Sequence, residues 1–388
     1  MSAALTARSV EILRDLIAFP TISTDSNLAM IDYLAERLTA RGALVLITRD
    51  ETGEKANVFA TLGPDVKGGV LLSGHSDVVP VTDQDWTTDP FALTEADGLL
   101  YGRGTCDMKG FIAAAMALAE SIDPAALKRP LHFAFTHDEE TGCLGAGHLV
   151  KDLEARGIVP DIAIIGEPTE IKIIEGHKGC YEYTTRFTGL EGHGSAPDLG
   201  VNAAEYAVRY VSRLMALREG LVARTPKGSR FDPPYTTINI GRISGGVAHN
   251  VIVGKAEVDW EMRPVQVSDA DFVKSEIGRY CEEELLPAMR RVHPSASIHT
   301  TAIGEVAGLE PMEHNAAREL VAELTGANSA ETVPFGTEAG LFQALGSHVV
   351  VCGPGSIRQA HKPDEYLARE QLVLCCDMLV KLGERLSR

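Results

Sequence analysis

No cluster of basic residues occurs in this chain of 388 residues, and its overall balance of charge is acidic. Lys and Arg together number 36 against 54 Asp and Glu, which gives a formal net charge of −18 at pH 7. Because the phosphate backbone of nucleic acids attracts positively charged surfaces, we expect no nucleic-acid partner.

Long apolar runs are also missing. The longest, residues 111–119, is far shorter than the ~20 residues that a helix needs to cross a bilayer. The N-terminal segment alternates apolar and charged residues at helical spacing, without a basic start or a small-residue cleavage site. We therefore expect neither a membrane partner nor secretion, and we predict a cytoplasmic protein.

Cysteine is scarce and scattered. The seven Cys residues are odd in number, and no two of them stand in Cys-x-x-Cys spacing. This argues against both a disulfide framework and a structural zinc site built on thiolates, so we expect reduced, buried thiols.

Chain length and apolar patterning predict more than one domain. Apolar residues make up 45% of the chain and charged residues 23%, as in ordinary globular proteins, and 388 residues are typical of two or three domains. Apolar runs at 57–62, 69–74, 131–136 and 161–166 alternate with helical patterns, which is typical of a buried, largely parallel sheet. A helix over 110–122, rich in Ala and Met, is expected to be buried.

The pattern changes near residue 178. From there to about 290 apolar and polar residues alternate in period two, with helical spacing at 202–217 and 268–286. Strands of this kind bury only one face, so the segment is predicted to be a small α+β unit.

After residue 290 the α/β pattern resumes. A helix, a strand and a final helix are predicted at 315–324, 348–353 and 368–386. We therefore predict an α/β fold with a mostly parallel central sheet, formed by a discontinuous metal-binding catalytic domain at 1–177 and 291–388. A smaller α+β domain is inserted at 178–290.

Side chains able to bind metals gather at the ends of the predicted strands and in the loops beside them. The candidates are His75, Asp107, Glu140, Glu167 and His361. In open α/β sheets ligands bind at the carboxyl ends of the strands, so these five segments are expected to meet.

Each candidate also has an ordinary explanation. His75 is typical of a loop histidine beside a capping acid, and Asp107 is typical of a helix N-cap. The pair Glu139 and Glu140 resembles a solvated acidic patch, and His361 stands in a loop rich in Gly and Pro. These explanations weaken together, because unrelated surface acids have no reason to recur at the ends of consecutive apolar strands.

Two histidines and three carboxylates form a mixed nitrogen and oxygen ligand set that suits zinc and, with lower affinity, cobalt or manganese. Two divalent ions bring four positive charges, which three carboxylates and one hydroxide balance, so a pair of ions is favoured over one. Glu139 is the candidate base for the attacking water. Adjacent residues that leave a strand end point in different directions, so Glu140 can face the metal while Glu139 faces the water. Asp77 lies close enough to His75 to accept a hydrogen bond from its ring.

Several ordered motifs resemble the zinc-dependent M20 family of peptidases and deacylases over nearly the whole chain. The motifs are SGHSDVVP at 73–80, YGRGTCDMKGF at 101–111, THDEETGCLGAG at 136–147, IIGEPT at 164–169, GHGSAP at 192–197, GGVAHNVIV at 245–253, PFGTEAGLF at 334–342 and GPGSIRQAHKPDEYL at 353–367. The resemblance implies a zinc-peptidase-like catalytic domain in which the five candidate ligands hold two zinc ions, with Asp107 as the bridge. It also implies that Glu139 is the general base, that Asp77 stands behind His75, and that the peptide bond from Asp107 to Met108 is cis.

The same resemblance implies that the inserted domain is a lid that forms a homodimer. A lid histidine, matched here by His193, would reach the partner's site and donate to the developing oxyanion. Taken alone, His193 is more typical of a turn histidine in a Gly-rich loop.

Further residues are matched to substrate contacts. Asn250 and Arg263 correspond to lid groups, and the planar fork of Arg263 suits an α-carboxylate, although Arg263 is also typical of a surface strand. Another wall of the site is expected at Gly336, Thr337 and Glu338, with Glu338 near a substrate ammonium.

The resemblance implies hydrolysis of the N-acyl amide of an amino acid. The last two motifs favour N2-acetyl-L-ornithine, cleaved to L-ornithine and acetate in arginine synthesis, with zinc as cofactor and cobalt as a possible substitute. Desuccinylation of succinyl-diaminopimelate is the nearest alternative, followed by a broader acylase or dipeptidase. A non-catalytic metal-binding module is the alternative from another class, and its signature would be the loss of Glu139.

Overall fold

The structure, a computed structural model, describes residues 2–388 and divides into two compact units. The main unit comprises the chain up to Gly176 together with Pro311–Thr332 and Thr337–Arg388. The inserted unit comprises His177–Glu310 and Val333–Gly336. The inserted unit therefore consists of one long segment and one short segment, and the chain returns to the main unit after each of them.

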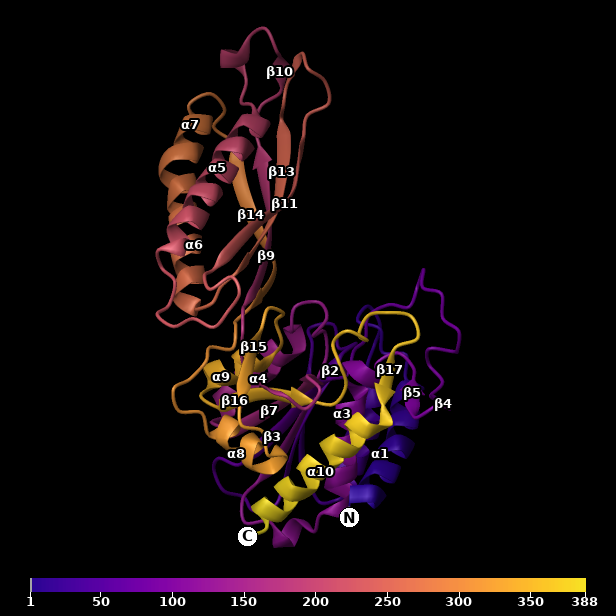
Figure 1. The fold of residues 1–388 in the computed structure, drawn as a ribbon. Coiled ribbons are helices and arrows are strands. Elements are labelled where there is room, and N and C mark those ends of the chain that lie inside the picture. The colour runs from indigo at the N-terminus through magenta and orange to yellow at the C-terminus, as the bar shows by residue number, and fades with distance from the viewer. Residues whose placement is uncertain (1) are drawn as a thin grey trace. The chain divides into compact units, whose positions relative to one another are not determined.

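The main unit is built on a sheet of eight strands (Figure 1). In spatial order they are β1 (Leu44–Arg49), β2 (Ala56–Leu62), β6 (Leu131–Thr136), β3 (Val70–His75), β7 (Ile162–Pro168), β16 (His348–Gly353), β8 (Ile173–His177) and β15 (Ala330–Val333). The four central strands β6, β3, β7 and β16 run parallel, which confirms the parallel core that the apolar runs predicted. Every residue of β3, β6 and β7 is buried, as expected for strands that are covered on both faces.

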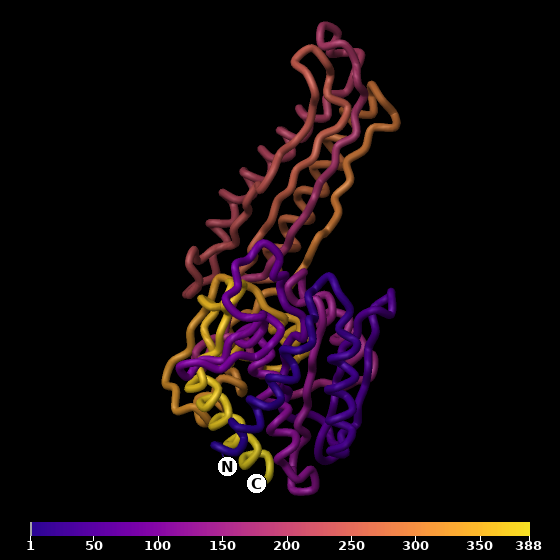
Figure 2. The backbone as a smooth tube through the Cα atoms, turned by 90° about the vertical axis from the view of Figure 1, so that its right-hand side faces the viewer, coloured from indigo at the N-terminus to yellow at the C-terminus, as the bar shows by residue number. Residues whose placement is uncertain are grey.

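Helices cover this sheet and each other. They are α1 (Ser2–Ile17), α2 (Leu28–Ala40), α3 (Gly110–Ser121), α4 (Leu144–Arg156), α8 (Ala316–Thr325), α9 (Ala339–Leu345) and α10 (Arg369–Leu386). Helix α3 packs against β3 and β7 and also against α1 and α10, which lie side by side near the two ends of the chain (Figures 1 and 2). All residues from Gly110 to Ala119 are buried. This burial on every side explains why the segment is apolar on every side.

A three-stranded sheet joins two segments that are far apart in the chain. Its strands are β17 (Tyr366–Ala368), β5 (Leu99–Tyr101) and β4 (Thr94–Ala96), in that order. Pairing of Tyr366 with Tyr101 brings the segment before β17 next to the Thr105–Lys109 turn that precedes α3. Two candidate ligands, Asp107 and His361, lie on these two segments.

The inserted unit is a four-stranded antiparallel sheet with helices packed on it (Figure 1). The strands, in spatial order, are β11 (Thr237–Gly245), β13 (Lys255–Arg263), β9 (Cys180–Thr188) and β14 (Ser297–Val306), and the helices are α5 (Ala203–Val222), α6 (Val267–Tyr280) and α7 (Leu286–Arg290). The rings of Tyr183 and Trp260 stack in its core with centroids 4.5 Å apart. Along β13 buried residues alternate with more exposed ones, which confirms the one-sided sheet that the sequence predicted.

The inserted unit also contains a short two-stranded antiparallel sheet. It pairs β10 (Gly192–His193) with β12 (Val251–Ile252), so that His193 lies opposite Val251. The two lid motifs of the sequence therefore meet in one place within the inserted unit.

The C-terminal boundary of the inserted unit differs from the predicted one. The sequence pattern predicts an end of the inserted domain at residue 290, whereas the unit extends to Glu310. The difference is β14, which pairs along β9 from Ser297 opposite Thr188 to Val306 opposite Cys180. Most residues of this edge strand are exposed or half-buried, so they carry little of the apolar alternation that marks a strand.

Among the helices of residues 2–388, none combines the length and apolar character that a bilayer-crossing segment requires.

Candidate metal centre

The five predicted ligands converge at the carboxyl edge of the parallel strands. His75 is the last residue of β3, Glu167 lies near the end of β7, and Glu140 belongs to the turn that follows β6. Asp107 sits in the turn before α3, and His361 lies on the loop between β16 and β17. Parallel strands bring segments distant in sequence to one edge, which is where open α/β sheets bind ligands.

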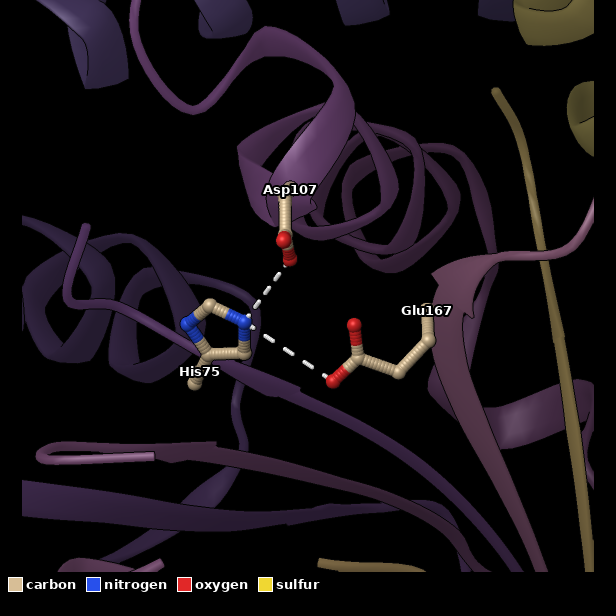
Figure 3. A group of neighbouring side chains, drawn as sticks. All are labelled: His75, Asp107 and Glu167. Carbon is tan, nitrogen blue, oxygen red and sulfur yellow. Dashed lines mark hydrogen bonds and ion pairs between the residues drawn. The ribbon is translucent and has the colours of Figure 1, made fainter. Parts of the chain in front are cut away.

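The first group of ligands is formed by His75, Asp107 and Glu167 (Figure 3). The Nε2 atom of His75 lies 3.1 Å from Asp107 Oδ1 and 3.7 Å from Glu167 Oε1. All three side chains are buried, and they point toward a common centre from three different elements. The geometry allows each of them to offer one atom to the same ion.

The second group is formed by Asp107, Glu140 and His361. The Nε2 atom of His361 lies 3.0 Å from Glu140 Oε1 and 3.3 Å from Asp107 Oδ2. Asp107 belongs to both groups and turns a different oxygen toward each of the two histidines. A carboxylate placed in this way is suited to bridging two ions.

The chemistry of these donors fits divalent metal ions. Oε1 of Glu167 is buried and receives no hydrogen bond, although a buried carboxylate oxygen ordinarily requires a donor or a cation. Nδ1 of His75 lies 2.9 Å from the main-chain carbonyl of Asp77. Because a carbonyl only accepts, Nδ1 carries the proton of the neutral ring, and Nε2 presents its lone pair to the first group.

The electrostatics of the cluster also favour cations. Burial disfavours a charged imidazole, yet Glu167 and Asp107 raise the pKa of His75 well above its ordinary value. Hydrogen bonds to Asp107 and Glu140 raise the pKa of His361 to about 10. Burial, reinforced by the charge of Asp107, raises the pKa of Glu167 well above the usual range for a carboxyl. The cluster thus concentrates negative charge that two divalent ions would neutralise.

Glu139 lies beside both groups without belonging to either. Burial raises the pKa of Glu139 to about 8, with a further contribution from the negative charge of Glu140. Bound divalent ions would lower that value, which leaves Glu139 suited to accept and return a proton near neutral pH. Its amide donates to Asp77 Oδ1 at 3.1 Å, so the turn that carries Glu139 is tied to the end of β3.

The role of Asp77 differs from the one expected. Its carboxylate was expected to accept from the His75 ring, but Oδ1 lies 3.6 Å from Nδ1 and the carbonyl of Asp77 makes the closer contact. The carboxylate instead accepts from Ser23 Oγ at 2.7 Å and from the amides of Glu139 and Glu140 at 3.1 and 3.4 Å. The carboxylate of Asp77 therefore holds the turn that carries Glu139 and Glu140.

The peptide bond between Asp107 and Met108 is cis, as the resemblance implied.

Thr337 and Glu338 lie at the start of α9 in the main unit. Oγ1 of Thr337 accepts from the amide of Ala339 at 3.1 Å. Glu338 is fully buried, and its two oxygens accept from Ser73 Oγ at 2.6 Å and Thr136 Oγ1 at 2.7 Å. Glu338 was expected to face a substrate ammonium, whereas both of its oxygens are bonded to hydroxyls of β3 and β6.

His193 and Asn250 lie together at the two-stranded sheet of the inserted unit. Both are exposed, and the amide of Gly194 donates to the carbonyl of Asn250 at 2.8 Å. Nδ1 of His193 accepts from the amide of Ser195 at 3.2 Å. A neutral His193 ring therefore carries its proton on Nε2, where it can be donated to another group.

Arg263 and Gly336 also belong to the inserted unit. The guanidinium of Arg263 pairs with Glu261 on the same strand, through Nη2 at 2.8 Å and Nε at 3.1 Å. Gly336 lies near Lys178 and Cys180, which precede and open β9.

Sequence reasoning missed two buried residues beside the centre, Arg103 and Glu365. Their side chains form an ion pair with Nη1 and Oε2 2.7 Å apart, and each is about 1% exposed. The sequence feature that could have identified Glu365 is its position four residues after His361, within the motif at 353–367.

Comparison with known proteins agrees with this geometry. Residues 71–385 match peptidase family M20/M25/M40. The acetylornithine deacetylase of Proteus mirabilis (strain HI4320) is 40% identical over 367 residues, covering 92% of this chain and 91% of the relative. That of Shigella sonnei (strain Ss046) is 38% identical over 365 residues, covering 92% of each chain.

A solved structure shares the fold. The YXEP protein of Bacillus subtilis, a dinuclear metal-binding peptidase of the M20 family, matches with a TM-score of 0.62 and 20% identity over 98% of both chains. The sequence match spans the segments that carry all five converging ligands, and the fold match spans nearly the whole chain. This chain therefore belongs to peptidase family M20/M25/M40.

Proposed function

We propose that this protein is a dinuclear metal-dependent hydrolase that removes the acetyl group from N2-acetyl-L-ornithine, giving L-ornithine and acetate. The observation that carries the proposal is the pair of ligand groups that share Asp107, with Glu139 directly beside them. Two acetylornithine deacetylases at 38 and 40% identity over most of the chain support the choice of substrate.

His75 and Glu167 would hold one ion and Glu140 and His361 the other, with Asp107 between them. Divalent ions bound there supply a polarised acyl carbonyl and a water that is acidic near neutral pH. Glu139 takes the proton of the water as its oxygen attacks the carbonyl carbon. When the C–N bond breaks, Glu139 gives the proton to the leaving amine, so the acyl group departs as acetate and the base returns to its starting state.

Zinc is the proposed native metal. Two imidazoles and three carboxylates offer nitrogen and oxygen donors without any thiolate, a set that zinc accepts readily and cobalt accepts as a substitute. Dinuclear metal binding by the related YXEP protein supports a pair of ions.

The acyl group distinguishes this proposal from its nearest alternative, succinyl-diaminopimelate desuccinylation, which requires the same metal positions. The test is to measure released amine from N2-acetyl-L-ornithine and from N-succinyl-diaminopimelate with the same zinc-loaded protein. We expect higher kcat/KM on the acetylated substrate. A clear preference for the succinylated substrate would reverse the order, and comparable rates on many N-acyl amino acids and dipeptides would indicate a broad acylase.

A non-catalytic metal-binding module is opposed by one feature of the site. Such a module has no need of a base, whereas Glu139 lies beside both ligand groups and its turn is held by Asp77. The same assay decides the question, because a module of this kind would release no amine from either substrate.

We further propose that the inserted unit is a lid that forms a homodimer and contributes His193 to the partner's site. The support is that His193 is exposed on the unit's two-stranded sheet with a proton available on Nε2. It would donate to the oxyanion that develops on the acyl carbonyl. A role in arginine synthesis and a cytoplasmic location remain predictions of the sequence.

Replacement of His193 tests this role. His193→Ala is expected to lower kcat by about 10²–10³-fold, the usual effect of losing one oxyanion donor, with metal content unchanged. The measurement is kcat on acetylornithine, with Asp198→Asn as a control at another exposed residue of the same loop.

Hybrid dimers test whether His193 acts across subunits. Mixing His193→Ala with Glu139→Ala is expected to restore part of the activity, because one site of the hybrid then contains both residues. Absence of recovery after subunit exchange, verified by mass spectrometry, would contradict a contribution in trans.

A further inference from the structure

Glu365 is a buried carboxylate that receives hydrogen bonds from the segment carrying Asp107. Its Oε1 accepts from the amides of Cys106 and Asp107 at 2.9 and 3.0 Å. Its Oε2 accepts from the amide of Gly104 at 2.9 Å and from Arg103 Nη1 at 2.7 Å. Four donors from five consecutive residues therefore converge on one side chain, which fixes the main chain that bears the shared ligand.

Arg103 extends this contact toward the loop that carries His361. Nη1 of Arg103 also donates to the carbonyl of Lys362 at 3.3 Å, and Nη2 donates to Gln84 Oε1 at 2.6 Å. The guanidinium lies over the ring of Trp86, 5.0 Å from its centroid. A planar guanidinium with several fixed donors suits a position where three segments must be held at once.

Gln84 completes the link to the second histidine. Its Nε2 donates to the main-chain carbonyl of His361 at 3.0 Å. A chain of hydrogen bonds thus runs from the amide of Asp107 through Glu365, Arg103 and Gln84 to the backbone of His361. The two ends of this chain are the two ligands whose side chains meet at 3.3 Å.

Apart from this hydrogen-bond network, the two ligand groups differ in how firmly the surrounding fold holds their side chains. His75 and Glu167 lie on the buried strands β3 and β7 and are themselves buried. The His361 side chain is 50% exposed, and its residue has a φ of +64° on a loop, a conformation that non-glycine residues rarely adopt. The second group therefore depends more on contacts that hold the loop.

We propose that Glu365, together with Arg103, is a positioning residue that sets the distance between Asp107 and His361 and so sustains binding of the second metal ion. This inference rests on the proposed function, since it assumes that the two groups hold two ions. Glu365 binds no ion and no substrate, and it acts only through the segments that carry the ligands.

The decisive variant is Glu365→Gln. Glutamine retains the size of the side chain, but its amide nitrogen only donates, so it cannot accept the two hydrogen bonds that one carboxylate oxygen now receives. The matched control is Glu175→Gln, because Glu175 is another buried glutamate of the main unit that pairs with an arginine, Arg318.

The measurement is the stepwise affinity of metal-stripped protein for Zn²⁺, determined by competition with a chelator. In Glu365→Gln we expect the tighter ion to bind within about threefold of wild type and the weaker ion to lose about 10–100-fold, the usual effect of removing an outer partner of a metal site. Glu175→Gln should bind both ions as wild type does. Equal loss of both ions, or no loss of either, would overturn the proposal.

Cobalt gives a second readout that a general loss of stability does not change. The visible absorption of Co²⁺ added as the second equivalent is expected to shift or weaken in Glu365→Gln and to match wild type in Glu175→Gln. A spectrum of the second equivalent identical to that of wild type would contradict a positioning role.

Gln84→Ala keeps the proposal testable if Glu365→Gln does not fold, because Gln84 lies on a half-buried loop. It is expected to weaken the second ion by about 2–10-fold, the value of one hydrogen bond, and leave the first unchanged. Unchanged binding of the second ion in this variant would count against the network. If wild type itself binds fewer than two ions or releases no amine, the proposed function fails. If wild type binds two ions and Glu365→Gln binds both with the affinities of wild type, only the role of Glu365 is refuted.

Discussion

Replacing Glu139 by glutamine is expected to lower kcat on acetylornithine by at least about 100-fold while two metal ions remain bound. Glutamine occupies the same space, but its amide has negligible basicity, so the proton of the attacking water has no acceptor at that position. Glu139 belongs to neither ligand group, which is why metal content should persist. The main-chain amide of residue 139 can still donate to Asp77, because the substitution changes only the side chain.

The experiment compares kcat, bound metal and melting temperature in wild type, Glu139→Gln and Glu120→Gln. Glu120 is a suitable control because it is a partly buried glutamate of the same unit that pairs with Arg8 and Arg37 instead of facing the metal groups. Turnover in Glu139→Gln close to that of wild type would place the base elsewhere. Loss of metal from that variant would make Glu139 a ligand.

The second large effect is expected from Asp107→Asn. Only one atom of an asparagine side chain can accept or ligate, since the other is an NH₂ group, so the residue cannot serve two ions at once. The amide of Asp107 still bonds to Glu365, so the local main chain should be retained. We expect at most one tightly bound ion per chain. The loss of kcat/KM should exceed about 100-fold, which is the largest effect usual for removing an outer partner of a metal site.

Metal analysis after dialysis, together with kcat/KM at saturating zinc, checks this expectation. Asp152→Asn serves as the control, because Asp152 accepts hydrogen bonds from Thr48 and Arg156 in the main unit and lies in neither group. Two tightly bound ions in Asp107→Asn would exclude a bridging role for Asp107.

The sequence predicted the central part of the fold because burial leaves a clear pattern. The strands β3, β6 and β7 are buried throughout and mostly apolar, and α3 is apolar from Gly110 to Ala119, so each stands out against its flanking loops. These elements are also the ones that place the ligands at one edge. The convergence of His75 and Glu167 could therefore be anticipated without a structure.

Elements with mixed surfaces were harder to predict. Strand β14 carries hydroxyl and charged residues along an edge, and without its partner β9 nothing in its sequence shows that it extends the inserted sheet. The domain boundary was misplaced for this reason. A pairing between distant segments is a property of the fold and not of either segment alone.

The same limit applies to hydrogen bonds around the site. The chemistry of His75 required an acceptor for its ring, but whether the carbonyl or the carboxylate of Asp77 fills that role depends on backbone geometry. Likewise, Glu338 stands in a predicted substrate segment yet bonds to two hydroxyls of β3 and β6. Residue type predicted which groups would be near the metals, whereas their partners followed from the folded chain.

In the proposed site, five side chains from separate segments hold two divalent ions that are required for amide hydrolysis. Metal titration tests this proposal: the protein is stripped of metal and titrated with Zn²⁺, and bound ions per chain and acetylornithine hydrolysis are measured in the same samples. We predict no hydrolysis in the stripped protein, saturation at two ions per chain, and full activity at that point. Saturation at one ion per chain with full activity, or hydrolysis by the stripped protein, would contradict the dinuclear site.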